Sequence, residues 1–225
     1  MGLSSKYLER ASTFQKEANE LETLSGKYSV ARLIYFLVGL GIIILSFQFN
    51  ILLGIALIVL FLLSFYALIQ KHLRIQFDMR QKKRLAKVNQ LEAAVLQNHD
   101  FSYYNNGSIY ADTAHPYSDD LDLFGPKSLF QYLNRCNSLL GRDVLANALL
   151  SPVNKLQLTP IQNAIKELKD KLDWRQSFQA FGMDVNDKKG DLDNLSKWLD
   201  EPNFMLNNLL LKVAVILVPL IDLAL

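Results

Sequence analysis

Charged residues are absent from one long stretch near the amino terminus, at residues 33–70. As a single helix this stretch would extend about 57 Å at a rise of about 1.5 Å per residue, nearly twice a hydrocarbon core of about 30 Å. The polar break at residues 48–50 divides it into two segments of near-spanning length, 33–47 and 51–69. The pattern predicts a transmembrane helical hairpin. A buried helix pair in a soluble protein is disfavoured, because both segments are apolar on all faces.

Basic residues flank this hairpin on both sides. Lys27 and Arg32 precede it, and the turn between its helices carries no charge. The residues that follow it, called here the basic cluster, are Lys71, Arg74, Arg80, Lys82, Lys83, Arg84 and Lys87. The positive-inside rule therefore places both ends in the cytoplasm of a plasma or inner membrane. The cluster is a candidate surface for lipid headgroups or for nucleic acid, and lipid is favoured.

Amphipathic helices are expected on either side of the hairpin, at residues 1–32 and 71–98. In the first, heptad spacing predicts a narrow seam, which comprises Tyr7, Ala11, Phe14, Ala18, Leu21, Ser25 and Tyr28. In the second, a less regular stripe comprises Leu73, Phe77, Leu85, Val88, Leu91 and Val95. The two helices emerge side by side, so an antiparallel stalk is the economical pairing. Self-association into a dimer, through these seams or through the later helices, is the rival arrangement.

An acidic connector is expected at residues 99–125, because helical periodicity is lost there and no Lys or Arg occurs between residues 100 and 125. Its candidate metal ligands are Asp112, His115, Asp119, Asp120 and Asp122. Their spacing fits no ligand template, so a solvated acidic loop is favoured over a metal site.

The distal half of the basic cluster lies too far from the bilayer to feel its charge. On an upright helix that leaves the membrane at Lys71, Arg80 lies about 14 Å and Lys87 about 24 Å from the exit. Both distances exceed the Debye length of about 8 Å at physiological salt. We therefore expect the acidic connector to be the partner of Lys82, Lys83 and Arg84.

A small cytoplasmic bundle of helices is predicted at residues 126–203. Pro126 suits the first position of a helix, and Gly141 is expected to separate that helix from the next. Thr159 and Pro160 indicate the start of a third helix. Further helices are expected at residues 174–181 and 192–199. The predicted fold class is thus all-α: a transmembrane hairpin, amphipathic stalk helices and a small helical bundle.

A third apolar segment covers residues 204–225 and is interrupted by Lys212, Pro219 and Asp222. It is long enough to span the membrane, and it is expected to open a second hairpin in a longer protein of which this sequence is the N-terminal part. An interfacial helix is the alternative, because of the two charges.

Charge and cysteine content restrict the chemistry further. Twenty-four Lys and Arg against 22 Asp and Glu leave a net charge of +2, too balanced to indicate nucleic-acid binding by itself. The single cysteine, Cys136, forms no intrachain disulfide and is compatible with the cytosol. His72, His99 and His115 lack paired catalytic groups in the sequence. No catalytic, cofactor-binding or metal site is predicted.

Two segments carry a family resemblance. Residues 120–152 read DLDLFGPKSLFQYLNRCNSLLGRDVLANALLSP, and residues 161–182 read IQNAIKELKDKLDWRQSFQAFG. In order, the matching motifs are LFG at 123–125, SLF at 128–130, LNR at 133–135, GR at 141–142 and LLSP at 149–152. With residues 115–117 and the pair Trp198 and Leu199, about 85 of the 225 residues are involved. This series resembles the core-domain helices of the MutS family of DNA mismatch repair ATPases, and the hairpin resembles that family's membrane-anchored branch.

The resemblance implies a P-loop ATPase that binds ATP and Mg²⁺ and acts on DNA, but this chain departs from that pattern. The hairpin stands where the mismatch-reading domain would be, which puts DNA binding in doubt. No G-x-x-x-x-G-K-[ST] loop occurs in the sequence, so ATP and Mg²⁺ would need a domain beyond Leu225. The alternative function is a structural membrane adaptor that binds protein partners without DNA or ATP activity.

Overall fold

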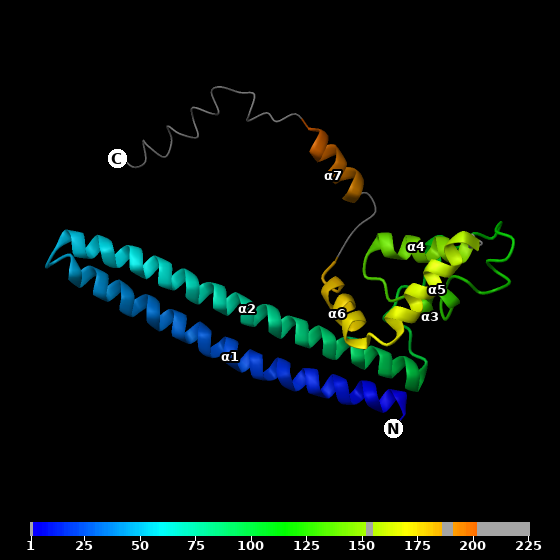
Figure 1. Ribbon diagram of the computed structural model, residues 1–225, viewed down its shortest axis with the longest axis horizontal. Coiled ribbons are helices and arrows are strands. Elements are labelled where there is room, and N and C mark those ends of the chain that lie inside the picture. Colours follow the sequence, from blue (N-terminus) through cyan, green and yellow to red (C-terminus); the bar gives the residue numbers. More distant parts are fainter. Residues whose placement is uncertain (1, 152–154, 186–190, 202–225) are drawn as a thin grey trace. The chain divides into compact units, whose positions relative to one another are not determined.

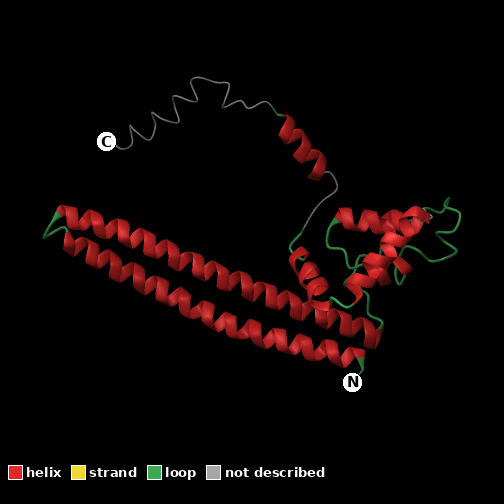
Figure 2. Cartoon of the chain, in the orientation of Figure 1, coloured by secondary structure: helices red, strands yellow, loops and turns green. Residues whose placement is uncertain are grey.

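The computed structural model describes residues 2–151, 155–185 and 191–201. The chain divides into two compact units, Met1–Val185 and Asn186–Leu225. All regular structure in the described residues is helical, as expected for an all-α protein (Figure 2). The third apolar segment, 204–225, lies outside the described residues.

Two very long helices dominate the first unit, and they lie side by side and antiparallel (Figure 1). Helix α1 spans Leu3–Ser46 and has 44 residues, while α2 spans Ile51–Asn98 and has 48. The predicted break between them is confirmed: Asn50 caps α2 by accepting a 2.8 Å hydrogen bond from the backbone N–H of Leu52. The stalk and hairpin segments, expected separately, are therefore continuous helices that end at one short turn.

Specific side-chain pairs define the register of α1 against α2. The Ser25 hydroxyl lies 3.0 Å from Nε2 of His72, and Nζ of Lys71 lies over the Tyr28 ring at 5.7 Å. Farther toward the turn, the hydroxyl of Tyr35 is hydrogen bonded to that of Ser64. The paired residue numbers add to nearly the same sum along the hairpin, so the two helices run in register without a slip.

The predicted seam of α1 is confirmed, with Ala11, Ala18 and Ser25 buried along it. The predicted stripe of α2 is wrong at its first two positions: Leu73 is 51% exposed and Phe77 is 43% exposed.

The buried positions of α2 form two different faces. His72, Ala86 and Ala93 are buried and are spaced by multiples of seven residues, on the face that contacts the α1 seam. Val88 and Val95 are also buried, but nearly half a turn away from that face, where the later helices pack. Because α2 contacts two neighbours, the stripe chosen by hydrophobicity follows the face toward the later helices and includes none of the three positions that face α1.

Four shorter helices follow in the first unit, and three of their predicted starts are wrong. Helix α3 spans Leu129–Leu133 and begins after Ser128, not at Pro126, because Gly125 and Lys127 adopt positive φ angles incompatible with a helix. Helix α4 spans Leu139–Leu150 with Gly141 inside its first turn, since Ser138 caps it by accepting from the N–H of Gly141 at 3.1 Å.

Helix α5 spans Lys155–Lys169, so Pro160 lies inside the helix and not at its start. The proline ring matches the helical φ angle, and its cost is one missing hydrogen bond near the first turns. Helix α6, Leu172–Gly182, agrees with the expected helix at 174–181. It packs against α2.

A single described helix, α7 at Asp191–Asp200, belongs to the second unit and agrees with the helix expected at 192–199. It is amphipathic, and Leu195, Trp198 and Leu199 are all more than half exposed.

Both α1 and α2 are long and apolar enough to cross a membrane, judged by length and composition. In the most apolar part of each helix only 6% of the residues are buried. The large apolar side chains of both segments, such as Leu37 at 59% and Leu63 at 66%, instead face outward.

Candidate functional site

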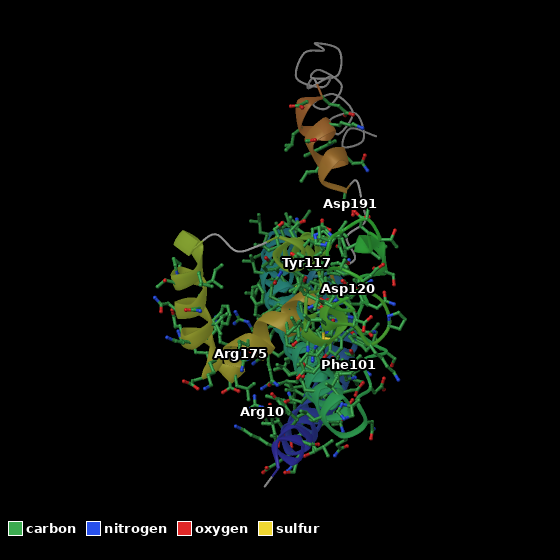
Figure 3. The ribbon with its side chains drawn as sticks, turned by 90° about the vertical axis from the view of Figure 1, so that its right-hand side faces the viewer. Arg10, Phe101, Tyr117, Asp120, Arg175 and Asp191 are labelled. Carbon is green, nitrogen blue, oxygen red and sulfur yellow. The ribbon has the colours of Figure 1, made fainter. Side chains whose placement is uncertain are left out.

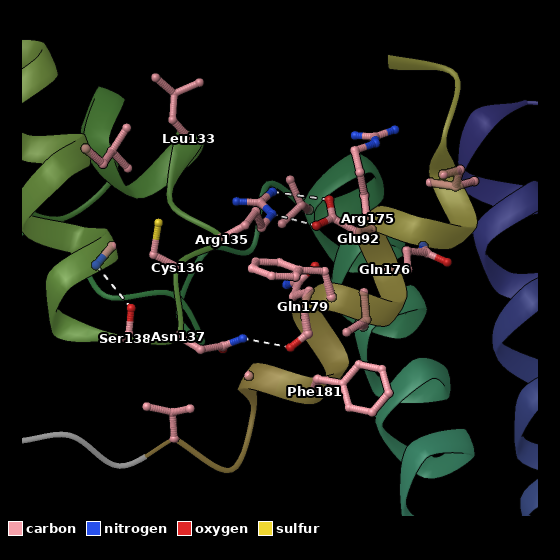
Figure 4. Close-up of a pocket in the computed structure, with 18 of the residues that line it drawn as sticks. Glu92, Leu133, Arg135, Cys136, Asn137, Ser138, Arg175, Gln176, Gln179 and Phe181 are labelled. Carbon is pink, nitrogen blue, oxygen red and sulfur yellow. Dashed lines mark hydrogen bonds and ion pairs between the residues drawn. The ribbon is translucent and has the colours of Figure 1, made fainter. Parts of the chain in front are cut away.

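A cavity of about 1100 Å³ lies where α2, the segment between α3 and α4, α4 itself and α6 meet (Figure 4). Most of its lining is apolar and comes from three helices: Val88, Val95, Leu140, Val144, Phe178 and Phe181. A volume of this size and a largely apolar lining with a few polar groups are typical of ligand or peptide sites.

An ion pair forms the polar wall of this cavity. Arg135 is bound to Glu92 through two hydrogen bonds, Nε to Oε1 at 2.5 Å and Nη2 to Oε2 at 3.2 Å. The Tyr104 hydroxyl donates to the same carboxylate at 3.2 Å, and its ring lies 4.0 Å from the guanidinium carbon. Burial, together with the charge of Glu92, raises the pKa of Tyr104 well above its ordinary value. The Glu92 carboxylate is thus paired with the Arg135 cation and accepts a hydrogen bond from the neutral Tyr104 phenol.

The segment between α3 and α4 is held in place by its asparagines. Asn134 donates to the carbonyl of Asn105 at 3.0 Å and accepts from the N–H of Cys136 at 2.9 Å. Asn137 donates to the carbonyl of Gln179 at 2.7 Å, which ties the segment to α6. A Cβ at Gly182 would lie 2.9 Å from the Asn137 side chain, so α6 approaches as closely as a glycine allows.

Cys136 lies half-buried in the cavity wall. Burial raises the pKa of its thiol, and this outweighs the lowering by the Arg135 backbone and by the charge of Arg142. The thiol is therefore protonated near neutral pH. Glu92, the only carboxylate among the described lining residues, is engaged by Arg135, so this lining favours binding over acid–base chemistry.

A polar junction at the edge of the cavity joins three helices. Gln176 of α6 donates to Oδ1 of Asn89 on α2 at 2.8 Å and accepts from Arg10 of α1 at 2.9 Å. Arg10 also forms an ion pair with Asp173. Asn89 is 0% exposed and Gln176 is 4% exposed, so these amides satisfy each other inside the packed helices.

Lys82, Lys83 and Arg84 do not pair with the acidic connector, and that expectation is wrong. Lys82 binds Glu17 at 2.5 Å and Lys83 binds Glu22 at 2.9 Å, both across the α1–α2 interface. Arg84 binds Asp184, just after α6. The antiparallel partner helix places Glu17 and Glu22 directly beside Lys82 and Lys83, which a loop beyond the end of α2 does not.

The acidic connector instead covers α4. Nε2 of His115 lies 3.1 Å from the carbonyl of Leu150, and the Tyr117 hydroxyl donates to the same carbonyl at 2.7 Å. Figure 3 labels Tyr117 and Asp120 of the connector. These side chains satisfy the open carbonyls at the end of that helix. Asp112 accepts from the N–H of Ala114 at 2.9 Å in a local turn. In the described residues no group of three or more His, Cys, Asp or Glu side chains can hold a metal ion.

Sequence reasoning missed the residues that organise this region: Glu92, Tyr104, Asn89 and Gln176. The sequence did offer a sign of Asn89, because it lies three residues after Ala86 and four before Ala93, at the helical spacing of these small buried residues. Arg135 was singled out only as part of a motif.

Comparisons with protein-family models, with curated proteins and with solved structures find no match to this chain.

Proposed function

We propose that this chain is a membrane anchor: residues 33–70 cross the bilayer as a helical hairpin and hold the helical body on the cytoplasmic side. The observation that carries this proposal is exposure. Only 6% of the residues in each apolar helix segment are buried, whereas a core helix of a soluble protein would be mostly covered. An apolar surface of this extent requires lipid around it.

The orientation follows from the flanking charge. Lys27, Arg32, Lys71 and Arg74 all lie at the open end of the hairpin, and the turn at 48–50 has none. Cations remain on the cytoplasmic side during insertion, so both stalk ends and the body face the cytoplasm.

We further propose that the body is the core of a membrane-anchored MutS-like protein whose ATPase domain lies beyond Leu225. Support comes from how the resembling segments contact one another. The N–H of Phe130 donates to the carbonyl of Leu123 at 3.0 Å, and the Phe124 and Phe130 rings are 5.5 Å apart. Tyr117 binds the end of the segment at 149–152. The motifs at 123–125 and 128–130 thus pack against each other, and residues 115–117 contact the motif at 149–152. ATP, Mg²⁺ and any DNA would be bound by the fuller protein.

A structural adaptor is the second candidate, and the apolar cavity favours it. A partner helix inserted between α4 and α6 would need neither nucleotide nor DNA. In that case the cavity itself is the functional surface.

Cysteine labelling tests the anchor. In a Cys136→Ser background, Gln48→Cys should react with a membrane-impermeant maleimide added to intact cells, while Ser102→Cys should react only after lysis. Ser102 is exposed, so its protection would reflect the membrane and not burial. Efficient labelling of Ser102→Cys from outside would reject the orientation.

The reading frame downstream of Leu225 separates the two candidates. A G-x-x-x-x-G-K-[ST] loop followed by a hydrophobic strand that ends in an acidic residue would support the MutS-like protein. A stop codon directly after Leu225 would leave the adaptor. The chain itself is expected to hydrolyse no ATP in either case.

A further inference from the structure

Six of the seven residues of the basic cluster fall into two sets when their contacts are compared. The seventh, Arg80, is exposed and has no ion pair among the described residues. In the distal set, Lys82, Lys83 and Arg84 have carboxylate partners within the protein, while Lys87 is exposed and lies over the Tyr103 ring at 5.7 Å. In the proximal set, Lys71 contacts only the Tyr28 ring. Arg74 is exposed and has no ion pair among the described residues. The protein therefore leaves open the cations nearest the hairpin.

The helix register brings two more cations to the same level. Because Ser25 lies against His72 and Tyr28 against Lys71, Lys27 and Arg32 of α1 flank the exit point of α2. Lys27 is exposed and Arg32 is half-buried, and neither has an ion pair among the described residues. Lys27, Arg32, Lys71 and Arg74 form what we call the proximal collar.

The collar lies within reach of a charged surface. Arg74 is about 4.5 Å beyond Lys71 along the helix axis, and Lys27 and Arg32 are about as close on α1. These distances are shorter than the Debye length of about 8 Å, whereas Lys82 lies about 16 Å away.

Neighbouring residues neither neutralise nor cover the collar. Glu22 is bound to Lys83, and Asp78 is one turn beyond Arg74, on the side away from the hairpin. Exposed apolar groups border the cations on both sides, with Tyr66 at 63% and Leu73 at 51% exposure. A band of cations interleaved with amphipathic and apolar side chains matches the boundary between headgroups and acyl chains.

We propose that the proximal collar binds the phosphate groups of anionic phospholipids in the cytoplasmic leaflet. This inference rests on the membrane anchor proposed above and names the lipid class that the anchor recognises. Duplex DNA is the other polyanion to consider, but its phosphates would have to approach a surface already occupied by the bilayer. Among the cations that stand clear of the membrane, Lys82, Lys83 and Arg84 already have carboxylate partners, which leaves Arg80 as an isolated exposed cation there.

Spin-labelled lipids measure this preference directly. The purified chain is reconstituted into phosphatidylcholine vesicles with a trace of spin-labelled phosphatidylglycerol or phosphatidylcholine, and the motionally restricted fraction gives a relative association constant. We expect a several-fold preference for phosphatidylglycerol, since each cation near the surface contributes up to about fivefold. The preference should fall as salt is raised.

Two matched variants identify the cations responsible for the lipid preference. Replacing Lys27, Arg32, Lys71 and Arg74 by Gln should bring the ratio close to one. Replacing Lys82, Lys83, Arg84 and Lys87 by Gln removes the same charge and should leave it unchanged. An equal loss in both variants, or no preference in the unaltered chain, would overturn the proposal. Displacement of the labelled lipid by duplex DNA would overturn it too and assign the collar to nucleic acid.

Extraction by alkaline carbonate separates this inference from the anchor. A chain that is extracted is not inserted, and the membrane anchor itself fails. A chain that stays in the vesicles but shows equal association with both lipids fails only the lipid inference.

Discussion

Asn89 and Gln176 join three helices although neither side chain is charged. The two side-chain amides are hydrogen bonded to each other, and Gln176 also accepts a hydrogen bond from Arg10. Two uncharged side chains therefore connect α1, α2 and α6. A buried amide costs free energy when its partner is removed, because the remaining donor and acceptor have no water to replace it.

Asn89→Ala is therefore expected to destabilise the chain by about 1–3 kcal/mol. Urea unfolding of the detergent-solubilised protein, followed by Trp174 fluorescence in a Trp198→Phe background, measures the change. Gln15→Ala is the control: Gln15 bonds Asn19 at the surface at 2.9 Å, and its loss should stay within about 0.5 kcal/mol. Equal effects of the two substitutions would contradict the role of the buried junction.

Burial at Cys136 predicts a pH dependence. Because the folded protein raises the pKa of this thiol, the folded state holds the proton more tightly than the unfolded state does. The stability linked to this group is thus present below the ordinary thiol pKa and is lost as pH rises through the raised value. Alkylation by iodoacetamide should reach half its maximal rate at a higher pH than for Ser102→Cys in a Cys136→Ser background. A midpoint at or below that of the exposed cysteine would be inconsistent with burial.

Among the elements, the hairpin contains a close approach between α1 and α2 at Gly39. A Cβ at Gly39 would lie 2.4 Å from Cε2 of Phe61. That ring is stacked against Tyr35 and Phe65, each at a centroid distance of 5.5 Å, so it has little freedom to move aside.

Gly39→Ala is expected to weaken the packing of α1 on α2 by about 1–3 kcal/mol, the usual cost of overpacking. Gly41→Ala, two residues away in the same helix, meets nothing within 4 Å and should have almost no effect. The loss of helicity of the reconstituted protein during titration with SDS compares the two. A larger effect at Gly41 would show that another surface of α1 makes the important contact.

For the whole first unit, the Glu92–Arg135 pair is one of the links that hold the body on the stalk. The two side chains are only 19% and 27% exposed, and they join α2 to the segment between α3 and α4. Removing Arg135 leaves a partly buried carboxylate without its cation.

Arg135→Ala is therefore expected to cost about 1–3 kcal/mol, between the values for surface and buried pairs. Hydrogen exchange at residues 88–96 and 134–138 should rise together. Adding Glu92→Gln should recover part of the loss, because it removes the unpaired charge. Arg175→Ala is the control, since that side chain is exposed and bonds only the carbonyl of Lys169 in the described contacts. If it is equally destabilising, the ion pair is not one of these links.

Local patterns in the sequence determined the elements with the strongest signals. The uncharged stretch, its break at residues 48–50 and the seam through Ala11 and Ala18 were recognisable because they depend on periodicity and solvation within one helix. The boundaries predicted at Pro126 and Gly141 failed because Ser128 and Ser138 compete as caps, and their success depends on backbone conformation nearby. The start predicted at Thr159 failed because α5 already begins at Lys155.

Only the tertiary structure decided which charges are free and which polar groups are satisfied. Lys82 and Lys71 have the same side chain on the same helix, yet one faces Glu17 and the other only a tyrosine ring. The fold of two helices in antiparallel register places residues more than sixty positions apart within hydrogen-bonding distance. No pattern along one helix encodes that register, so the sequence alone specified the hairpin, whereas the junction at Asn89, the cavity and the proximal collar arose from the packing of helices against one another.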